Sequence, residues 1–414
     1  MKFPNLGICV LLLFQALENA RAATPADSVF PRGNKMAFMG YSGKPERDLA
    51  NGFTVAGPVY GNQLPYLEHC FTNGWPVVAH IGPHITFNDK SPDKYKLNET
   101  TLRAEVERQM QELAPHKEIV WWAVTPEELR PWRNDEINYL EVVCATIRRN
   151  DPQQRPIYLY NPNSRTAKSL EPIARQVDVL AKGCYVNYSG KKRDRAWVRW
   201  SVEQEVTALQ TCGRPRAIPL LMPELCQDPE PREDAEIRAW VRHDVYLGLA
   251  SGAKGVLIWS LFKREKVKRS WQLWYDAYAE CARELNGPCG LAQIFLFGQR
   301  HSEIRVTLVK GNAAAKVQLG GDVEPTTTSQ EEHAERYVKM ASWTAAEFIH
   351  NGSDWLFLIN SANGPATFAL ANLPVTGRPV NAFDDTPLAL DHGNLTLPAY
   401  GVTAIRYTPG EKTK

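Results

Sequence analysis

Three glutamates stand directly after apolar runs, where they could take part in acid–base chemistry. Glu127 and Glu128 follow the run 119–124, and Glu224 follows the run 217–222; a proline precedes the first glutamate in each case. Two nearby carboxyl groups can divide the roles of acid and nucleophile, provided that burial holds one of them protonated near neutral pH. Such a pair is what hydrolysis of a glycosidic bond requires.

Two kinds of residue pattern alternate along the part of the chain that carries these glutamates. Short apolar runs occur at 35–41, 54–57, 76–81, 119–124, 156–160, 183–186, 217–222 and 255–259. Between them, stretches with apolar residues three and four apart predict helices at 100–113, 135–149, 169–180, 197–210 and 233–250. The stretch 64–73 offers only a two-turn helix, and 271–285 is expected to be the last barrel helix. Eight buried-type strands with intervening helices predict a (β/α)8 TIM barrel. A doubly wound sheet is the alternative, but no G-x-G-x-x-G or Walker loop follows any strand.

The pattern of residues changes from alternating strands and helices to strands alone near residue 290. The runs 294–297, 304–309, 355–359 and 402–407 are β-rich and are separated by Gly, Asn, Asp and Pro turns. They predict a small all-β sandwich after the barrel. We therefore divide the 414 residues into a signal peptide at 1–22, a barrel at 23–290 and a β-sandwich at 291–414.

The leader and the charge balance indicate where the protein is located and which classes of partner it lacks. Lys2, the apolar run 8–14 and the small-residue site at Ala20 and Ala22 are typical of a secretory signal peptide, so we expect a secreted or periplasmic protein. No later stretch is long and uncharged enough to predict a transmembrane segment. With 48 basic and 46 acidic residues, the chain has no strong positive electrostatic field that would attract nucleic acid. The oligomeric state is left open.

The cysteines and histidines predict no cofactor and no metal centre. Without the leader, seven cysteines remain, and Cys281 and Cys289 bracket a turn that a local disulfide could close. No pair of cysteines or histidines lies near further ligands at a metal-binding spacing; His80 and His84 are four apart, but at a strand end and a loop. The nine histidines also lie mostly away from strand ends, which disfavours a metal-dependent barrel hydrolase.

In a barrel, reactive groups lie at the carboxyl ends of the strands. Glutamates after the fourth and seventh strands make this chain resemble the retaining clan of (β/α)8 glycosidases that includes cellulases, β-galactosidases and β-mannanases. The resemblance implies that Glu127 or Glu128 is the acid/base and that Glu224 is the nucleophile. The clan usually has Asn before its acid/base, where this chain has Pro126. A separation of ~5 Å between the two carboxyl groups would indicate retention, and ~6.5–9.5 Å inversion.

The resemblance also implies a sugar platform. The clan tends to place a tyrosine after strand six and a tryptophan at the end of strand eight, which Tyr185 or Tyr188 and Trp259 match here. Other polar side chains at strand ends could bind sugar hydroxyls. The candidate substrate-binding residues are therefore Tyr41, Tyr60, His80, His84, Asn161, Tyr185, Tyr188 and Trp259. The predicted partner is an oligo- or polysaccharide.

Alternatives remain for the glutamates and for the whole chain. Glu224 could form a structural ion pair with Arg216 or Arg242, and either Glu127 or Glu128 could cap a helix instead of reacting. We favour Glu127 as the acid because it follows a proline, as Glu224 does. The chain could also be a non-catalytic carbohydrate-binding protein on a glycosidase-like barrel, since a fold does not fix a function.

Overall fold

The computed structural model describes residues 24–83, 98–188, 194–318, 337–373, 379–388 and 390–407, and its first body is a curled parallel sheet. The strands are β1 (Ala37–Gly40), β2 (Val77–Ile81), β3 (Ile119–Val124), β4 (Ile157–Asn161), β5 (Val179–Cys184), β6 (Ile218–Pro223) and β7 (Gly255–Ile258). They pair in the order β1-β7-β6-β5-β4-β3-β2. This is the order of an eight-stranded barrel in which the strand position between β1 and β2 has no regular strand. Glu127 follows β3 and Glu224 follows β6.

The segment around Ala56 fills that place. Ala56 forms a parallel bridge with Val77 of β2, and the Thr54 N–H donates to the Phe38 carbonyl of β1 at 3.0 Å. A side chain on Gly57 would collide with the backbone of β1, so this segment approaches β1 more closely than a regular strand with side chains could. The second expected strand is thus a single bridge, and it completes the expected (β/α)8 barrel.

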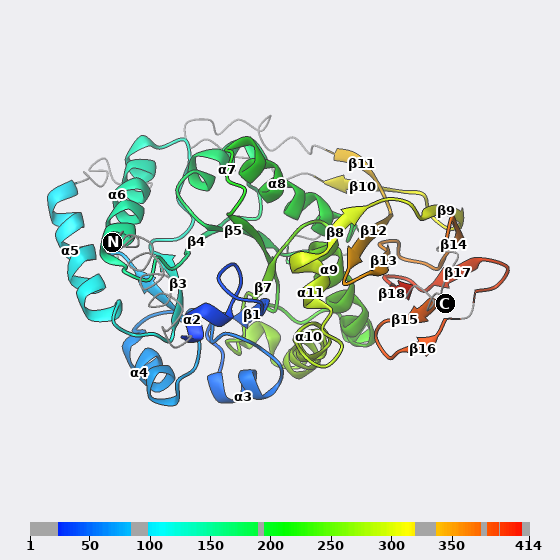
Figure 1. Ribbon diagram of the computed structural model, residues 1–414, viewed down its shortest axis with the longest axis horizontal. Coiled ribbons are helices and arrows are strands. Elements are labelled where there is room, and N and C mark those ends of the chain that lie inside the picture. Colours follow the sequence, from blue (N-terminus) through cyan, green and yellow to red (C-terminus); the bar gives the residue numbers. More distant parts are fainter. Residues whose placement is uncertain are drawn as a thin grey trace, which may run out of the picture.

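Helices surround the strands (Figure 1). They are α2 (Pro25–Ser28), α3 (Pro45–Ala50), α4 (Leu64–Asn73), α5 (Glu99–Leu113), α6 (Asn134–Asn150), α7 (Ala167–Ala174), α8 (Trp197–Thr211), α9 (Ile237–Ala250) and α10 (Trp271–Asn286), with 3-10 turns η1 (Pro231–Glu236) and η2 (Glu265–Val267). Helix α5 illustrates their sequence logic: Leu102, Val106 and Met110 recur every four residues and are buried. Its N-cap residue Asn98 accepts a hydrogen bond from the Thr101 N–H at 3.1 Å.

One expected helix and the strand after it were placed wrongly. The helix predicted over 169–180 ends at Ala174, and β5 begins at Val179, four residues before its expected start. The sequence misleads here because Lys182 interrupts the apolar run. In the structure Lys182 is fully buried, and its ammonium donates to Ser201 Oγ at 2.6 Å. A satisfied buried cation is compatible with a strand, although it hides the strand from a search for apolar runs.

The second part of the chain is all β after one short helix. Its elements are α11 (Ala292–Phe297), β8 (Gln299–His301), β9 (Arg305–Lys310), β10 (Ala314–Gln318), β11 (Tyr337–Ala341), β12 (Trp343–His350), β13 (Ser353–Asn360), β14 (Ala366–Ala371), β15 (Pro379–Asn381), β16 (Thr386–Pro387), β17 (Asn394–Leu397) and β18 (Val402–Tyr407). They form a six-stranded sheet in the order β16-β15-β18-β13-β12-β8, a three-stranded sheet β17-β14-β9 and a β10-β11 pair. The expected β domain after the barrel is therefore present, beside helices α9 and α11 (Figure 1).

The six-stranded sheet is buried on both faces along β13. Leu358 packs with Phe368 between the two larger sheets, whereas Phe357 on the opposite face lies 4.4 Å from the ring of Phe295 in α11. The run 294–297 was expected to be a strand and is a helix, because a short apolar run has no periodicity that separates the two. One packed cluster continues from the barrel helices into this sheet, so the domain boundary at 290/291 stays a prediction.

The expected disulfide does not form. Cys281 is buried within α10, and Cys289 is exposed, with its thiol 3.4 Å from the Phe383 carbonyl. All seven cysteines of the described residues are free thiols. The turn between the two cysteines therefore holds its shape without a cross-link.

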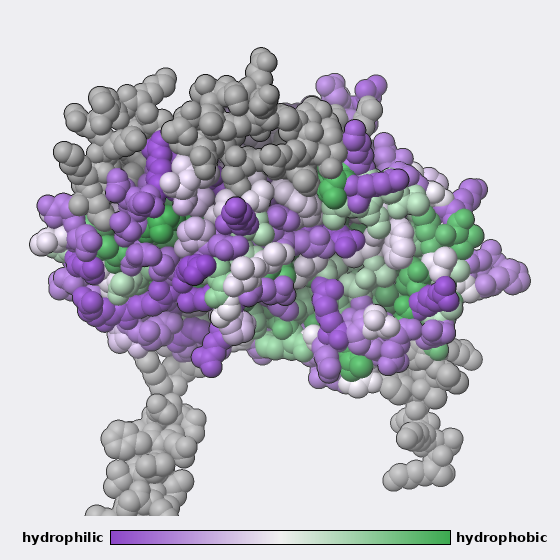
Figure 2. All heavy atoms as spheres, turned by 90° about the horizontal axis from the view of Figure 1, so that it is seen from above, coloured by the Kyte–Doolittle hydropathy of each residue, from purple (hydrophilic) through white to green (hydrophobic). Residues whose placement is uncertain are grey.

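The surface of the described residues is mainly polar. Figure 2 shows hydrophilic side chains over much of one face, with smaller hydrophobic groups over both the barrel and the β domain. Within the described ranges no helix combines the length and the apolar character needed to cross a bilayer. The predicted signal peptide, residues 1–22, lies outside the described residues.

Candidate active site

Glu127 lies at the carboxyl-end mouth of the barrel, where the sequence places it. It follows β3 after the cis peptide bond Thr125–Pro126. The buried Tyr41, just after β1, donates its hydroxyl to Glu127 Oε1, and the hydroxyls of Tyr41 and Tyr158 are 3.1 Å apart. A half-buried carboxyl group is thus held at the mouth by a tyrosine pair from inside the barrel.

Burial raises the pKa of Glu127 to about 7. The hydrogen bond from Tyr41 opposes this rise, and the charge of Glu128 adds to it. Glu128 itself is exposed, with a positive φ of 61°, a conformation that is uncommon for residues other than glycine. The carboxylate that raises the pKa of Glu127 is therefore its chain neighbour and not the glutamate after β6.

Glu127 and Glu128 line a cavity of about 230 Å³. The lining residues are Tyr60, Glu127, Glu128, Tyr160, Pro162, Asn163, Tyr185, Tyr188 and Trp259. They follow five different strand positions at one end of the barrel, so no local segment could build this cavity alone. Aromatic faces and carboxylates in one small cavity suit the apolar C–H faces and the hydroxyls of a sugar ring.

The aromatic wall of this cavity is braced by ring contacts. Tyr60 stacks on Tyr41 at 5.2 Å, and Tyr185 stacks on Trp259 at 5.1 Å. The indole N–H of Trp259 donates to the Tyr60 hydroxyl. The guanidinium of Arg264 lies 4.0 Å from the centroid of the Trp259 ring. These contacts fix the position of the rings that a ligand would meet.

A larger cavity of about 710 Å³ shares Tyr60 and Glu127 with the smaller one. Its wall also includes His80, the last but one residue of β2, whose backbone N–H and C=O both bond to the side chain of Gln63 at 2.8 and 2.9 Å. Arg108 of α5 also lines this cavity. Glu127 therefore borders both cavities.

Glu224 occupies a different environment from the one expected at the mouth. It is 2% exposed, and its carboxylate accepts hydrogen bonds from the backbone N–H groups of Asn187 and Tyr188, the latter at 2.8 Å. The Cys226 thiol lies 3.7 Å from Glu224 Oε2. Because Tyr188 lines the smaller cavity, Glu224 lies one residue behind the cavity wall.

The pKa of Glu224 is also raised to about 7, chiefly by burial. The two backbone N–H groups and the charge of Arg195 oppose this rise, because they stabilise the ionised form, whereas Asp244 adds to it. No ion pair between Glu224 and Arg216 or Arg242 is found among the described residues; Arg242 pairs with Glu284 instead.

A buried hydrogen-bond chain joins Glu224 to the β domain. Arg195 contacts Asn187 Oδ1 at 3.0 Å and Asp244 Oδ1 at 3.0 Å. His243 then lies 2.8 Å from Asp244 and, through its other ring nitrogen, 2.8 Å from the hydroxyl of Ser361. Ser361 follows β13, so a residue of the β domain helps to order the loop that holds Glu224.

The remaining predicted site residues divide into three groups. Tyr60, Tyr185, Tyr188 and Trp259 line the smaller cavity and His80 lines the larger one. Tyr41 and Asn161 are buried instead, and the Asn161 amide donates to the carbonyls of Leu159 and Ala181, so it is committed to the barrel backbone. His84 lies outside the described residues.

Sequence reasoning missed Tyr160, Pro162, Asn163 and Arg264. The available signal was the end of the run 156–160, where Tyr160 directly precedes Asn161. The sequence favours Asn161 because it is a polar residue at a strand end. In the structure the side chain of Tyr160 reaches the cavity and that of Asn161 turns to the backbone, since successive strand residues point to opposite faces.

No protein-family model and no curated protein matches this chain. Solved structures do match in fold. The α-amylase of Geobacillus thermoleovorans complexed with acarbose is 10% identical over 95% of this chain and 100% of its own, with a TM-score of 0.55. An Anoxybacillus α-amylase is 10% identical over 91% and 98%, with a TM-score of 0.51, and AmyP in complex with maltose is 8% identical over 89% of both chains, with a TM-score of 0.50.

These matches extend over the barrel and the β domain together. At such low identity they concern the fold alone. They confirm the expected architecture of a (β/α)8 barrel followed by a β domain, as found in solved glycoside hydrolases.

Proposed function

We propose that this protein is a glycoside hydrolase whose general acid is Glu127. The observation that carries the proposal is the position of Glu127, a half-buried carboxyl group with a pKa near 7, on the edge of an aromatic cavity at the carboxyl-end mouth of the barrel. A carboxyl group with this pKa is protonated often enough at neutral pH to donate to a leaving oxygen. Solved α-amylases share the fold, and a fold alone does not carry an activity.

In this proposal Glu127 protonates the glycosidic oxygen, and Glu224 supplies the second carboxylate. The N–H groups of Asn187 and Tyr188 favour the ionised form of Glu224. In a retaining reaction Glu224 attacks the sugar carbon, the glycosidic bond breaks, and Glu127 then takes a proton from the water that releases the sugar. For this attack the segment whose backbone N–H groups hold Glu224, at Asn187 and Tyr188, has to move, because Glu224 is only 2% exposed.

Glu128 is the competing second carboxylate, since it lines the same cavity as Glu127. A 2-deoxy-2-fluoro glycoside, which traps the covalent intermediate of a retaining enzyme, separates the two. Mass spectrometry of the digested protein should find the sugar on the peptide that contains Glu224. Label on Glu128 would reassign the nucleophile, and hydrolysis without any label would favour the inverting alternative.

The activity itself is tested by screening the full chain against 4-nitrophenyl glycosides and neutral polysaccharides. We expect turnover that Glu127→Gln reduces by about 10²- to 10⁴-fold, whereas Glu99→Gln on the outer helix α5 leaves it unchanged. Binding of sugars without turnover would favour the alternative, a carbohydrate-binding protein. Equal activity of Glu127→Gln and wild type would refute the role of Glu127.

We also propose that the leader exports the protein, so that it meets its glycan outside the cytoplasm. Lys2, the apolar run 8–14 and the site at Ala22 support this. Amino-terminal sequencing of the exported protein should begin near Ala23. Retention of residues 1–22 in the cell-associated protein would contradict the proposal.

A further inference from the structure

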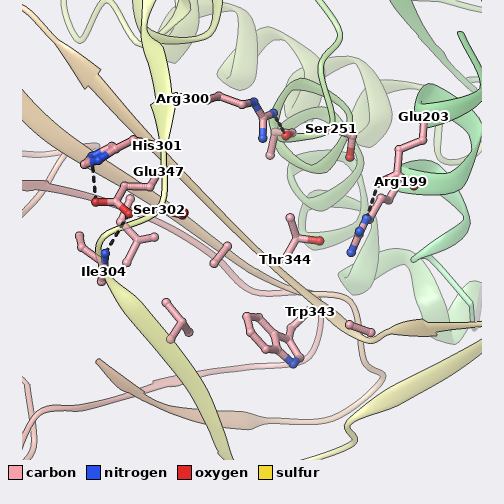
Figure 3. Close-up of a pocket in the computed structure, with 15 residues that line it drawn as sticks. Arg199, Glu203, Ser251, Arg300, His301, Ser302, Ile304, Trp343, Thr344 and Glu347 are labelled. Carbon is pink, nitrogen blue, oxygen red and sulfur yellow. Dashed lines mark hydrogen bonds and ion pairs between the residues drawn. The ribbon is translucent and has the colours of Figure 1, made fainter. Parts of the chain in front are cut away.

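The six-stranded sheet brings together three side chains that are distant in the sequence. His301 Nε2 of β8 lies 2.9 Å from Glu347 Oε1 of β12 and 3.3 Å from Asp354 Oδ1 of β13. One ligand-type atom from each residue lies within 4.8 Å of the other two. Figure 3 shows His301 and Glu347 facing one another in a cavity of about 430 Å³ between the barrel and the β domain.

The strand register explains this meeting. Glu347 is directly opposite His301, and Asp354 is opposite Ile349, two residues further along β12. Residues two apart on a strand point to the same face, so all three side chains share one face of the sheet. The cluster is therefore built by the tertiary pairing of three strands and has no local sequence spacing.

The candidate ligand atoms are already oriented. The second oxygen of Glu347, Oε2, accepts hydrogen bonds from the backbone N–H groups of Glu303 and Ile304 at 2.7 and 2.9 Å, which leaves Oε1 facing His301. The other ring nitrogen of His301 lies 3.9 Å from the Glu303 carboxylate. At that distance Glu303 acts on the imidazole through its charge and does not hydrogen-bond to it.

One polar atom at this cluster is buried without a hydrogen bond to any residue that the structure describes. It is the hydroxyl of Tyr407, a residue only 1% exposed that is opposite Asp354 in β18. His301 Nε2 is also buried, and its neighbours are the carboxylates of Glu347 and Asp354. Residues directly opposite one another on paired strands lie on the same face, so the Tyr407 side chain is on the face of the sheet that carries the cluster. Unsatisfied buried polar atoms are uncommon and point to a missing partner.

We propose that His301, Glu347 and Asp354 bind a divalent transition-metal ion, for which zinc is the best match. Zinc takes imidazole nitrogen at 2.0–2.1 Å and carboxylate oxygen at about 2.0–2.2 Å in a tetrahedron, which puts two ligand atoms about 3.3 Å apart. The observed 2.9 and 3.3 Å are close to this value, and the Glu347 and Asp354 oxygens, which lie within 4.8 Å of one another, would draw together around the ion.

The ion would be structural and independent of the proposed hydrolase activity. It would tie β8, the first strand after the barrel, to β12 and β13. With side chains 16%, 5% and 25% exposed, the cluster of His301, Glu347 and Asp354 is partly buried, and His301 and Glu347 line the cavity described above. A metal held by residues of three strands restrains their pairing more than an ion pair between two of them does.

Calorimetric titration of the chelator-treated, untagged full chain with zinc chloride tests the proposal, in a Cys289→Ser background that removes the exposed thiol. We expect one ion per chain, bound with micromolar or tighter Kd, and a rise in Tm of about 5 °C at a hundredfold excess of zinc over Kd. The absence of binding, or a Kd in the millimolar range, would overturn the site.

Two variants locate the ion. Asp354→Asn removes one charged ligand from a partly exposed side chain and should weaken zinc binding at least tenfold, and His301→Ala should abolish it. The matched control is His392→Ala, since His392 and Asp391 form an exposed pair 3.8 Å apart in the same β domain. If Asp354→Asn binds zinc as tightly as wild type, the ion is elsewhere and the assignment is wrong.

Discussion

Removing the hydroxyl of Tyr41 should make Glu127 a weaker acid. Tyr41 is fully buried and donates this hydroxyl to Glu127 Oε1, which stabilises the ionised carboxylate. A hydrogen bond to a charged group contributes about 1.5–3 kcal/mol, and one pKa unit corresponds to about 1.4 kcal/mol. Tyr41→Phe should therefore raise the pKa of Glu127 by about one to two units, from about 7 to about 8–9.

The assay needs no substrate. Carbon-13 NMR of glutamate carboxyl groups, with the Glu127 signal assigned from Glu127→Gln, follows the titration between pH 5 and 10. Tyr158→Phe is the control, because the Tyr158 hydroxyl contacts Tyr41 at 3.1 Å and donates no hydrogen bond to Glu127 among those found in the described residues. That variant should shift the pKa of Glu127 by less than half as much as Tyr41→Phe does.

The pH dependence of kcat/KM is a second way to measure the pKa shift of Glu127. A reaction that needs protonated Glu127 and ionised Glu224, each with a pKa near 7, should show a narrow bell in kcat/KM centred near pH 7. Tyr41→Phe should move the basic limb to higher pH and leave the acidic limb in place. An unchanged or lowered pKa of Glu127 in Tyr41→Phe would refute this account of how the carboxyl group is tuned.

Three further predictions concern Glu224, the wall of the smaller cavity and the buried pair of Arg195 and Asp244. Glu224 has a folded pKa near 7 against an ordinary 4.5, so the stability it contributes is present below pH 4.5 and is lost as the pH rises through 7, about 3 kcal/mol in all. The Tm of Glu224→Gln relative to wild type should therefore rise between pH 5 and 8 in calorimetry, and a constant difference would contradict this. Trp259→Ala should raise KM about tenfold by removing a ring of the cavity wall, whereas Trp75→Ala, outside both cavities, should not. Arg195→Met leaves the buried Asp244 carboxylate without its main partner and should lower the free energy of unfolding by about 3–5 kcal/mol in urea titration, with partial recovery on adding Asp244→Asn.

The apolar runs were enough to predict the barrel, because strand and helix periodicity are local properties. They also predicted the position of Glu127 at the mouth of the barrel, since a residue that directly follows a parallel strand must lie at one end of the barrel. The errors have local causes as well. Lys182 hid the start of β5, and the run 294–297 has a length at which helix and strand look alike.

The position of a residue after a strand does not determine where its side chain points. Glu127 and Glu224 both follow Pro at a strand end, yet one lines a cavity and the other lies behind Tyr188. This difference depends on which distant segment packs over each carboxyl group. Asn161 differs for a local reason, because strand alternation points it away from the cavity, and its amide donates to the carbonyls of Leu159 and Ala181.

The sequence by itself determined the barrel, the β domain after it and the end of the barrel at which a pair of carboxyl groups could act, because these follow from short-range patterns of hydrophobicity. The tertiary structure decided what surrounds each group: the hydroxyl of Tyr41 on Glu127, the amides of Asn187 and Tyr188 on Glu224, and the meeting of His301 with Asp354. Hydrogen bonding, burial and metal binding act over a few ångströms between residues tens to hundreds of positions apart. Only the folded chain brings such residues within that range.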